Sequence, residues 1–236
     1  MKLILGKNRK YLVKDNVKVI NTTDGKIRIK KKVAISHLGK KFAVLEPTLV
    51  DLMEKAFKRG SQVVLAKDAS LILTYTGIKP NSKVVDIGGG SGFLSIFLAW
   101  YLRDGKIVAY EKDERRIKII KENSEIAGIR NLKMKKKDVT KGISEKNLDL
   151  VTVDIKNPER IIKFVYKSLK VGGWLVVYCP VIEEILNVVK EIEKFGFSEP
   201  FVVENIVREW KVKNGTRPKT KGLMHTGFLL FVRKIE

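Results

Sequence analysis

The glycine-rich segment Asp86-Ile87-Gly88-Gly89-Gly90-Ser91-Gly92-Phe93 has the composition of a ligand-binding loop. It joins an apolar stretch predicted to be a strand to an apolar stretch predicted to be a helix. Glycines at positions 88, 90 and 92 permit positive φ angles and let a ligand approach the backbone. The N–H groups that begin the helix can bind a polar or anionic group. The dinucleotide pattern G-x-G-x-x-G would need its last glycine at position 93, where this chain has phenylalanine.

Four acidic residues, Asp86, Glu111, Asp138 and Asp154, each lie at the end of a predicted strand. The carboxyl ends of parallel strands form the edge where open α/β sheets bind ligands. Glu111, 19 residues beyond Gly92, is placed to accept both ribose hydroxyls of an adenosine, and Asp138 to accept from an adenine amino group. One polar strand end would be explained by solubility alone. Four acids together with the glycine loop predict a nucleoside cofactor, namely S-adenosylmethionine.

Strands and helices alternate through most of the chain, which predicts a parallel sheet with helices on both faces. The predicted strands are 83–87, 107–111, 132–136, 148–154, 174–178, 201–213 and 226–233, and the predicted helices are 93–102, 113–127, 158–169 and 183–195, with a turn at 170–173. The last two strands have no helix between them, so we expect an antiparallel closing pair. That pair distinguishes methyltransferases from dehydrogenases. The predicted fold is a seven-stranded, Rossmann-like α/β methyltransferase domain over residues 56–236.

Residues 1–55 are predicted to form a small basic β domain. The stretches 17–20 and 26–30 alternate in a strand-like manner around Asp24-Gly25, a hairpin turn signal. Residues 1–50 hold 13 Lys and Arg against three Asp and Glu, a net charge of +10. The whole chain of 236 residues has 48 basic and 26 acidic residues, a net charge of +22. A lysine-rich thermophilic surface would carry both signs, so this excess favours a nucleic-acid partner.

Several classes of protein do not match the sequence. No apolar run approaches the ~18 residues of a membrane span, and the apolar stretch at the N-terminus is too short for a signal peptide. The only cysteine, Cys179, excludes an intrachain disulfide framework, fits a reducing cytoplasm and is expected to be buried and inert. The two histidines, His37 and His225, are too few and too far apart to suggest a metal site.

Beyond the glycine loop, several segments resemble those of the tRNA adenine-N1 methyltransferases. This family modifies position 58 of the T-loop and, in archaeal members, also position 57. The segments are Leu45-Glu46-Pro47-Thr48, Lys58-Arg59-Gly60-Ser61-Gln62-Val63-Val64-Leu65-Ala66-Lys67-Asp68, Arg208-Glu209-Trp210, Arg217-Pro218 and His225-Thr226-Gly227-Phe228-Leu229. The glycine loop is common to many methyltransferases, whereas Gln62 to Asp68 and the two tail segments are more particular to this family. The resemblance extends from the Asp24-Gly25 hairpin to the last strand.

The resemblance implies a small N-terminal β domain on a methyltransferase domain, a homotetramer, and tRNA as the substrate. It also implies a set of cofactor-binding residues: Gln62, Val64, Gly88, Gly89, Gly90, Ser91, Gly92, Glu111, Arg116, Asp138 and Asp154. Asp154 is in addition the implied catalytic residue. Adenine N1 lies on the Watson–Crick edge, so the target base must be turned out. Methylation leaves the ring positive, and a carboxylate near the exocyclic amine would stabilise that charge.

The chain departs from the family pattern at three positions. Glu159 replaces the tryptophan of the usual Asp-x-x-x-Pro-Trp segment, which leaves the shape of the target pocket open. Ala66 replaces a proline, and Gly89 replaces a threonine. Two other functions therefore stay open: a methyltransferase acting on another substrate, such as protein isoaspartyl residues, and a non-catalytic tRNA-binding subunit. The net charge disfavours the first, and the intact glycine loop with its acids disfavours the second.

Three further features have two interpretations each. His225 could touch the target base or make a structural hydrogen bond. Trp210 could stack on a base, but its place in a predicted strand favours the core. Lys135-Lys136-Lys137 could contact phosphate or form a solvated edge.

Overall fold

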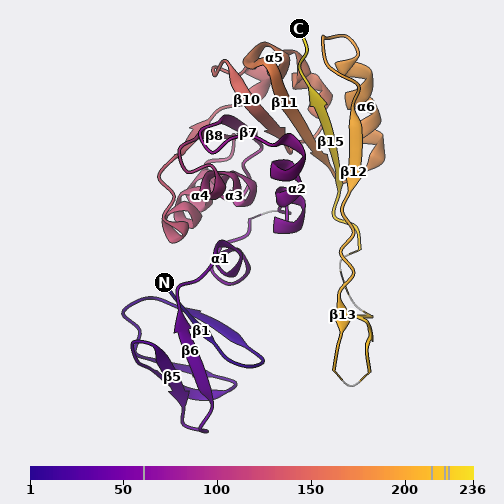
Figure 1. Cartoon of the computed structure of the whole chain (residues 1–236). Coiled ribbons are helices and arrows are strands. Elements are labelled where there is room, and N and C mark those ends of the chain that lie inside the picture. Colours follow the sequence, from indigo (N-terminus) through magenta and orange to yellow (C-terminus); the bar gives the residue numbers. More distant parts are fainter. Residues whose placement is uncertain (61, 214, 221, 223) are drawn as a thin grey trace. The chain divides into compact units, whose positions relative to one another are not determined.

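The computed structural model describes residues 1–60, 62–213, 215–220, 222 and 224–236. Ser61, part of the segment that resembles the family, therefore lies outside the described residues. The chain divides into two compact units. Unit 1 comprises residues 1–58 with 125–128, and unit 2 comprises 59–124 with 129–236. Figure 1 shows the elements of each unit.

Unit 1 is built on a six-stranded antiparallel sheet of order β2-β1-β6-β5-β4-β3. Its elements are β1 (Lys2–Leu5), β2 (Lys10–Val13), β3 (Val19–Thr22), β4 (Gly25–Ile29), β5 (Val33–Ser36), β6 (Lys41–Leu45) and α1 (Leu49–Lys55). A small core of Ile4, Val13, Ile27, Ala34 and Phe42 packs on one face of the sheet. The strong alternation of the strands, with one buried face and one exposed face, is the reason this short segment folds as a sheet.

The predicted hairpin in unit 1 forms, one residue out of the predicted register. Thr22 of β3 faces Gly25 of β4, so the two-residue turn is Thr23-Asp24 and not Asp24-Gly25. Gly25 has φ +93°, a conformation that suits glycine. The Asp24 carboxylate accepts hydrogen bonds from Tyr11 and Lys40 at 2.7 Å each, and these contacts fix the turn.

Unit 2 contains a seven-stranded sheet of order β12-β15-β11-β10-β7-β8-β9. The strands are β7 (Lys83–Ile87), β8 (Lys106–Glu111), β9 (Leu132–Lys136), β10 (Leu148–Val153), β11 (Leu169–Cys179), β12 (Phe201–Glu204) and β15 (Phe228–Arg233). Strands β9, β8, β7, β10 and β11 are parallel, and β15 is antiparallel to both β11 and β12. The predicted methyltransferase sheet with an antiparallel closing pair is confirmed.

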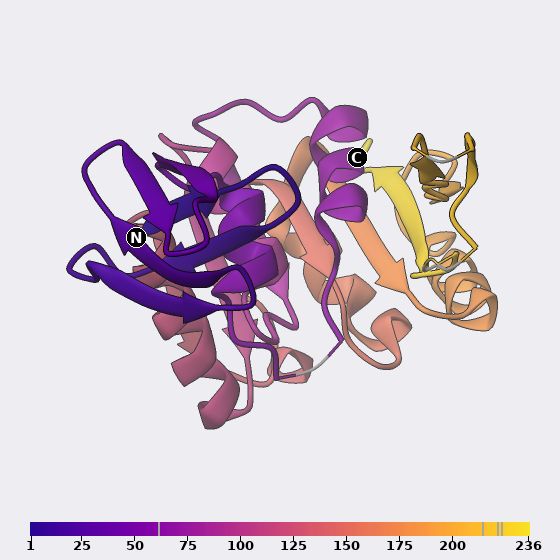
Figure 2. The ribbon, with the colours of Figure 1, turned by 90° about the horizontal axis from the view of Figure 1, so that it is seen from below.

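Helices cover both faces of this sheet. They are α2 (Ala66–Thr76), α3 (Phe93–Tyr101), α4 (Glu114–Ala127), α5 (Ile162–Ser168) and α6 (Ile182–Ile192), with short 3-10 turns η1 (Val139–Lys141) and η2 (Pro158–Ile161). Strand β15 separates two of them. Its Phe231 ring lies 5.2 Å from the ring of Tyr75 on α2, whereas its Leu230 packs with Ile185 of α6. Successive strand residues point to opposite faces, so α2 and α6 lie on opposite sides of the sheet, as Figure 2 shows.

Two predicted boundaries in unit 2 are wrong. Residues 170–173, expected to be a turn, lie inside β11 as an irregularity, because Leu148 pairs with Leu169 but Leu150 pairs with Trp174. The backbone of this irregular segment pairs instead with Lys234. The predicted strand 201–213 also breaks after Glu204.

The second half of that predicted strand forms a separate hairpin. Trp210-Lys211 (β13) pairs with Arg217-Pro218 (β14), away from the main sheet in Figure 1. The break occurs at Asn205, whose carbonyl and side-chain amide bind Lys67 instead of a neighbouring strand. Trp210 is 54% exposed, so its expected place in the core is wrong. Helix α2, which begins without a side-chain cap, was not predicted.

Candidate cofactor and target-base site

The glycine loop passes between the ends of β8 and β10. Gly88 has φ +88°, and a Cβ on it would lie 2.1 Å from the backbone oxygen of Asp154. The N–H groups of Gly88 and Gly89 both donate to the Tyr110 carbonyl at 3.0 Å. Gly90 and Gly92 also have positive φ, +55° and +82°. The glycines are therefore required by the backbone conformation and by the contact with β10.

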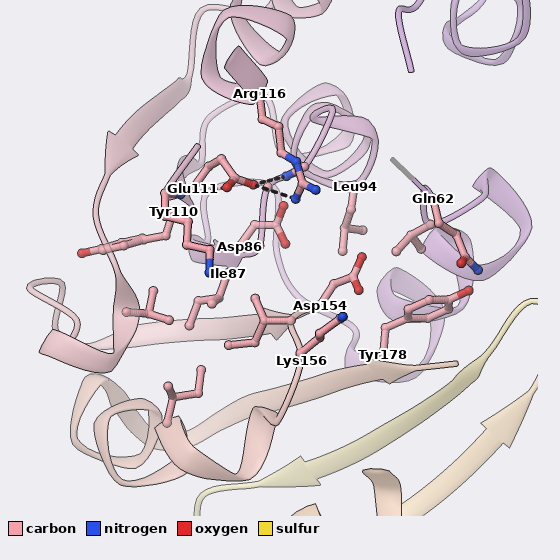
Figure 3. A pocket seen from close by; sticks show the side chains of 18 of the residues that line it. Gln62, Asp86, Ile87, Leu94, Tyr110, Glu111, Arg116, Asp154, Lys156 and Tyr178 are labelled. Carbon is pink, nitrogen blue, oxygen red and sulfur yellow. Dashed lines mark hydrogen bonds and ion pairs between the residues drawn. The ribbon is translucent and has the colours of Figure 1, made fainter. Parts of the chain in front are cut away.

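Glu111, the last residue of β8, is buried and rigidly held. Its Oε2 accepts from the Gly90 N–H at 2.9 Å, and its Oε1 accepts from the Lys112 and Asp113 N–H groups at 2.8 and 3.0 Å. The Arg116 guanidinium lies 3.8 Å from Oε2. Figure 3 shows the Glu111 carboxylate and the Arg116 guanidinium facing each other, with the contact dashed. A carboxylate fixed in this way still has lone pairs for ligand hydroxyls.

Asp86, near the end of the strand that precedes the loop, helps to fix the loop in place. It is buried inside β7, where Ser95 and Thr152 donate hydrogen bonds to its two carboxylate oxygens. Burial raises its pKa, and the charge of Glu111 raises it further, while the two hydroxyl donors oppose the shift. Ser95 lies on α3 and Thr152 on β10, so Asp86 connects the two elements on either side of the loop.

Asp138 follows β9 and caps the turn η1. Its Oδ1 accepts from the backbone N–H of Thr140 at 2.9 Å and from the Thr140 hydroxyl at 2.8 Å. These hydrogen bonds, the backbone one first, lower the pKa of the carboxyl, which favours the ionised form. Asp138 is exposed toward the cavity, so its second oxygen is available to an amino group.

Asp154 follows β10 directly, and its backbone N–H donates to the Ile87 carbonyl at 2.8 Å. The side chain is half-buried. Burial raises the pKa of this carboxyl to about 7; the charges of Asp86 and Glu184 add to the shift, and Arg116 opposes it. In the described part of the chain, no group donates a hydrogen bond to the carboxylate. The Asp154 carboxyl therefore lies beside the glycine loop without a hydrogen-bond donor from the described residues, and burial favours its neutral form.

These side chains face one cavity of about 700 Å³, a volume typical of small-molecule sites. Of the predicted site residues, those that line it are Gln62, Val64, Gly88, Gly89, Gly90, Ser91, Glu111, Arg116, Asp138 and Asp154. Figure 3 shows Gln62, Glu111, Arg116 and Asp154 around the same space. Gly92 is not among the lining residues. It caps α3, where a Cβ would press against Ile120 and Ile96.

Sequence reasoning missed a second wall of the cavity, made by Tyr178, Pro180 and Glu184. Tyr178 lies near the end of β11, and its hydroxyl donates to the Thr226 carbonyl. In Figure 3 its ring stands beside Asp154 and Gln62. Burial raises the pKa of the hydroxyl to about 12, so it stays protonated. Tyr178 lies in an apolar strand and carries no local sequence signal; only its position in the folded sheet brings it to the cavity.

The structure resolves the remaining ambiguous residues of the sequence. His225 Nδ1 lies 2.6 Å from Glu204 Oε1, and Nε2 lies 2.9 Å from the Pro180 carbonyl oxygen. The Glu204 hydrogen bond, followed by the Pro180 one, raises the pKa of the imidazole, because both nitrogens face acceptors. Cys179, between Tyr178 and Pro180, is fully buried, and burial raises the pKa of its thiol to about 12, as expected of an inert cysteine.

The three consecutive lysines have separate roles. Lys135 binds Glu145 and Ser144, Lys136 pairs with Glu114, and Lys137 lines the cavity. Among the residues that the structure describes, no group of acids, histidines and cysteine is arranged to hold a metal ion. None of the described helices combines the length and apolarity of a membrane span.

The cavity has the features that S-adenosylmethionine requires. Gly88 lies directly against the Asp154 backbone, so the loop cannot carry a side chain at this position. A carboxylate acceptor, Glu111, lies on one side of the loop, and a second, Asp138, lies beyond it. Backbone N–H groups at the start of α3 face the same space. Acceptors for a ribose and for an adenine amino group are thus present together.

Comparison with known proteins identifies relatives over nearly the whole chain. Residues 41–226 match the family model of the GCD14 subunit of the tRNA methyltransferase complex. The chain is 30% identical to the tRNA (adenine(57)-N(1)/adenine(58)-N(1))-methyltransferase TrmI of Methanocaldococcus jannaschii, covering 98% of this chain and 93% of the relative. It is 28% identical to the tRNA (adenine(58)-N(1))-methyltransferase TrmI of Thermus thermophilus, covering 86% and 80%.

Two solved structures are similar over the full length of the chain. One is a SAM-dependent O-methyltransferase from Thermotoga maritima, with a TM-score of 0.90 and 27% identity, covering 100% of this chain and 92% of that one. The other is the tRNA (m1A58) methyltransferase TrmI of Aquifex aeolicus, with a TM-score of 0.87 and 25% identity, covering 100% and 96%. Both are named as methyltransferases.

Proposed function

Because the chain belongs to the family of GCD14 subunits of the tRNA methyltransferase complex, we propose that it methylates N1 of adenine in tRNA. The methyl donor is S-adenosylmethionine, and the target is position 58 of the T-loop, with position 57 as a second target as in the Methanocaldococcus relative. The observation that carries this proposal is the cavity in which the glycine loop, Glu111, Asp138 and Asp154 meet.

The residues around the cavity fall into two groups, one suited to the cofactor and one suited to the target base. Glu111 would accept from the ribose hydroxyls and Asp138 from the adenine amino group. The glycine loop, Ser91 and Arg116 would surround the polar remainder of the cofactor, and Gln62 and Val64 would close it from the side of α2. The Tyr178 wall lies beside Asp154 and would receive the target base.

When bound, S-adenosylmethionine supplies an electrophilic methyl group on a positive sulfonium. Asp154 does the protein's part of the chemistry. Its carboxylate lacks a donor in the described structure, so it is available to the exocyclic amine of the target adenine. There it stabilises the positive charge that grows on the ring and can accept a proton. The rest of catalysis is alignment, because fixed side chains around the cavity would hold the methyl donor and the target base in a reactive geometry.

The decisive experiment is to incubate the protein with an unmodified tRNA transcript and labelled S-adenosylmethionine, and to map the modified base. Label at N1 of adenine 58, or of 57 and 58, supports the proposal. Transfer to an isoaspartyl peptide, with none to tRNA, would favour the alternative substrate class. Cofactor binding that is undetectable by calorimetry would favour a non-catalytic subunit.

Replacing Glu111 with alanine is expected to weaken S-adenosylmethionine binding by about 1–3 kcal/mol, because the ribose hydroxyls lose a charged acceptor. Isothermal calorimetry measures the change. Glu114→Ala is a matched control, since Glu114 lies three residues on, is exposed, pairs with Lys136 and does not line the cavity. Equal affinities for the two variants would remove Glu111 from the cofactor site.

We propose that the basic N-terminal domain, residues 1–55, binds tRNA phosphates, and that residues 56–236 form the catalytic domain. Lys30, Lys31 and Lys32 form the exposed connection between β4 and β5. Among the described ion pairs, none involves these three lysines. Their charges are therefore available to a polyanion.

Changing all three lysines to alanine is expected to raise the KM for tRNA and to lower the salt slope of tRNA binding by roughly one per lost phosphate contact. Fluorescence titrations at several salt concentrations measure the slope. The matched triple change to arginine keeps the charge and should keep the slope. A normal slope in the alanine variant would mean that these lysines serve only solubility or a subunit interface.

We further propose that the chain forms a homotetramer and acts in the cytoplasm. The segment that leads into the β13–β14 hairpin exposes Ile206 and Val207, and the hairpin itself exposes Trp210 and Val212. A second copy could cover these apolar side chains. The yeast relative from Candida albicans is named as the catalytic subunit TRM61, so assembly with a partner is a property of that relative. Light scattering of the purified protein gives the mass of the assembly.

The proposal of a cytoplasmic location rests on the single buried cysteine, which does not call for an oxidising compartment.

A further inference from the structure

Three consecutive residues, His225, Thr226 and Gly227, contact the wall residues Tyr178 and Pro180 on the side away from the cavity. The His225 ring binds the Pro180 carbonyl, and the Thr226 carbonyl accepts from the Tyr178 hydroxyl. A Cβ on Gly227 would lie 2.6 Å from the Tyr178 ring, so only glycine lets this ring approach. The segment just before β15 therefore fixes both the hydroxyl and the ring of Tyr178.

The Thr226 side chain is itself fixed by two residues of α2. Its hydroxyl donates to Asp68 Oδ2 at 2.8 Å and accepts from Lys67 Nζ at 2.8 Å. The Lys67 ammonium also donates to Asp68 Oδ1 and to the Asn205 carbonyl, both at 2.6 Å. All three of its protons have acceptors. Asp68 is 1% exposed, so its charge depends on these partners.

This network connects the two sides of the cavity. Gln62 and Val64, in the loop that precedes α2, line it on one side, and Tyr178 and Pro180 line it on the other. Lys67 and Asp68 begin the helix that follows the loop, and Thr226 joins them to Tyr178. Thr226 is not a lining residue, so any effect it has on the reaction must pass through the wall.

We propose that Thr226, held by Lys67 and Asp68, is a positioning residue that sets the place of Tyr178 and hence of the target base. This inference rests on the proposed function, since it assigns a role in binding the base to be methylated. The main cofactor contacts do not depend on the network, because the glycine loop, Glu111 and Asp138 are held by separate contacts. The role is distinct from catalysis, because Thr226 touches neither reactant.

The sharpest test is the pair Thr226→Val and Thr226→Ser. Valine keeps the shape but removes the hydroxyl, whereas serine keeps the hydroxyl. At saturating tRNA and cofactor, the valine variant is expected to lower the single-turnover rate of tRNA methylation by about 10- to 100-fold. S-adenosylmethionine affinity, measured by calorimetry, should stay within about twofold of the wild type. The serine variant should restore the rate.

Thr76→Val is the matched control. Thr76 is buried at the other end of α2, and its hydroxyl donates only to the Ile72 carbonyl of the same helix. It should leave the rate unchanged. A double-mutant cycle with Tyr178→Phe, which breaks the hydrogen bond to the Thr226 carbonyl, tests the route. If Thr226 acts through Tyr178, the two effects are not additive.

Four results would overturn the inference: a wild-type rate in Thr226→Val, a serine variant as slow as the valine variant, equal losses of rate and cofactor affinity, or additive effects in the cycle. If Thr226→Val fails to fold, Tyr178→Phe alone decides, since a wild-type rate in that variant overturns the inference too. If the wild-type protein does not methylate tRNA, the proposed function itself fails, a result distinct from an active enzyme whose rate ignores Thr226.

Discussion

Asp154→Asn is expected to lower the single-turnover rate of methyl transfer by about 100-fold or more, with little change in tRNA affinity. Asparagine keeps the shape of the side chain but removes the charge that stabilises the positive adenine ring. Removing one such electrostatic partner typically lowers the rate by about 100- to 1000-fold. Single-turnover kinetics with labelled cofactor measure the rate. Asp149→Asn is the control on the strand that precedes Asp154, because Asp149 pairs with Lys170 and does not line the cavity.

The same carboxyl predicts a pH dependence. Because its pKa is raised to about 7 by burial, Asp154 is largely protonated in the free enzyme below that pH. The kcat/KM of the wild type should therefore rise as the pH rises through about 7. The positive sulfonium favours the carboxylate, so the kcat profile should turn at a lower pH than kcat/KM. A full rate in Asp154→Asn, or the same pH profile in that variant, would contradict the catalytic role.

Gly88→Ala is expected to weaken S-adenosylmethionine binding by at least about 100-fold and to lower the melting temperature. The new Cβ would lie 2.1 Å from the Asp154 carbonyl oxygen at a position with φ +88°, so the loop and the end of β10 must move apart. Overpacking costs about 1–3 kcal/mol and a positive φ about 1–2 kcal/mol, so a combined cost of about 3 kcal/mol or more corresponds to a factor of about 100 or more. Calorimetry and thermal unfolding measure the two effects.

Gly77→Ala is a control that introduces the backbone strain of a positive φ without a steric clash. Gly77 caps α2 with φ +55°, and nothing lies within 4 Å of its Cβ position. It should lose about 1 kcal/mol of stability and none of its cofactor affinity. Normal cofactor binding in Gly88→Ala would mean that the loop adapts and that its tight contact with Asp154 does not shape the site.

The sheet was predictable because three of its parallel strands, β7, β8 and β10, are short apolar runs that end at, or just before, an acid or a glycine. Glu111 and Asp154 were identified from that position alone, and the cavity gathers them with Asp138. Their roles toward cofactor and base stay predictions. The antiparallel closing pair followed from the missing helix between the last strands. Local sequence pattern and strand order thus predicted most of the fold, together with the part of the site formed by the glycine loop and the acids at the strand ends.

The far side of the site depends on contacts that no local pattern marks. Lys67 and Thr226 are 159 residues apart in the sequence, and their hydrogen bond exists only because α2 packs near the start of β15. Tyr178 resembles any apolar strand residue until Thr226 and Gly227 fix it. Trp210 was expected in the core because its strand was extended too far. That strand stops where Asn205 turns to bind Lys67.

The burial of Cys179 has a practical consequence for reagents. A thiol whose pKa is raised to about 12 holds almost no thiolate at neutral pH, and this side chain is fully buried in β11. Maleimides and disulfide reagents should leave the native protein unlabelled. An added surface cysteine, for example at the exposed Val171 in the irregular segment of β11, would then be the one reactive thiol on the molecule. A single dye or spin label could be attached there without first removing the natural cysteine.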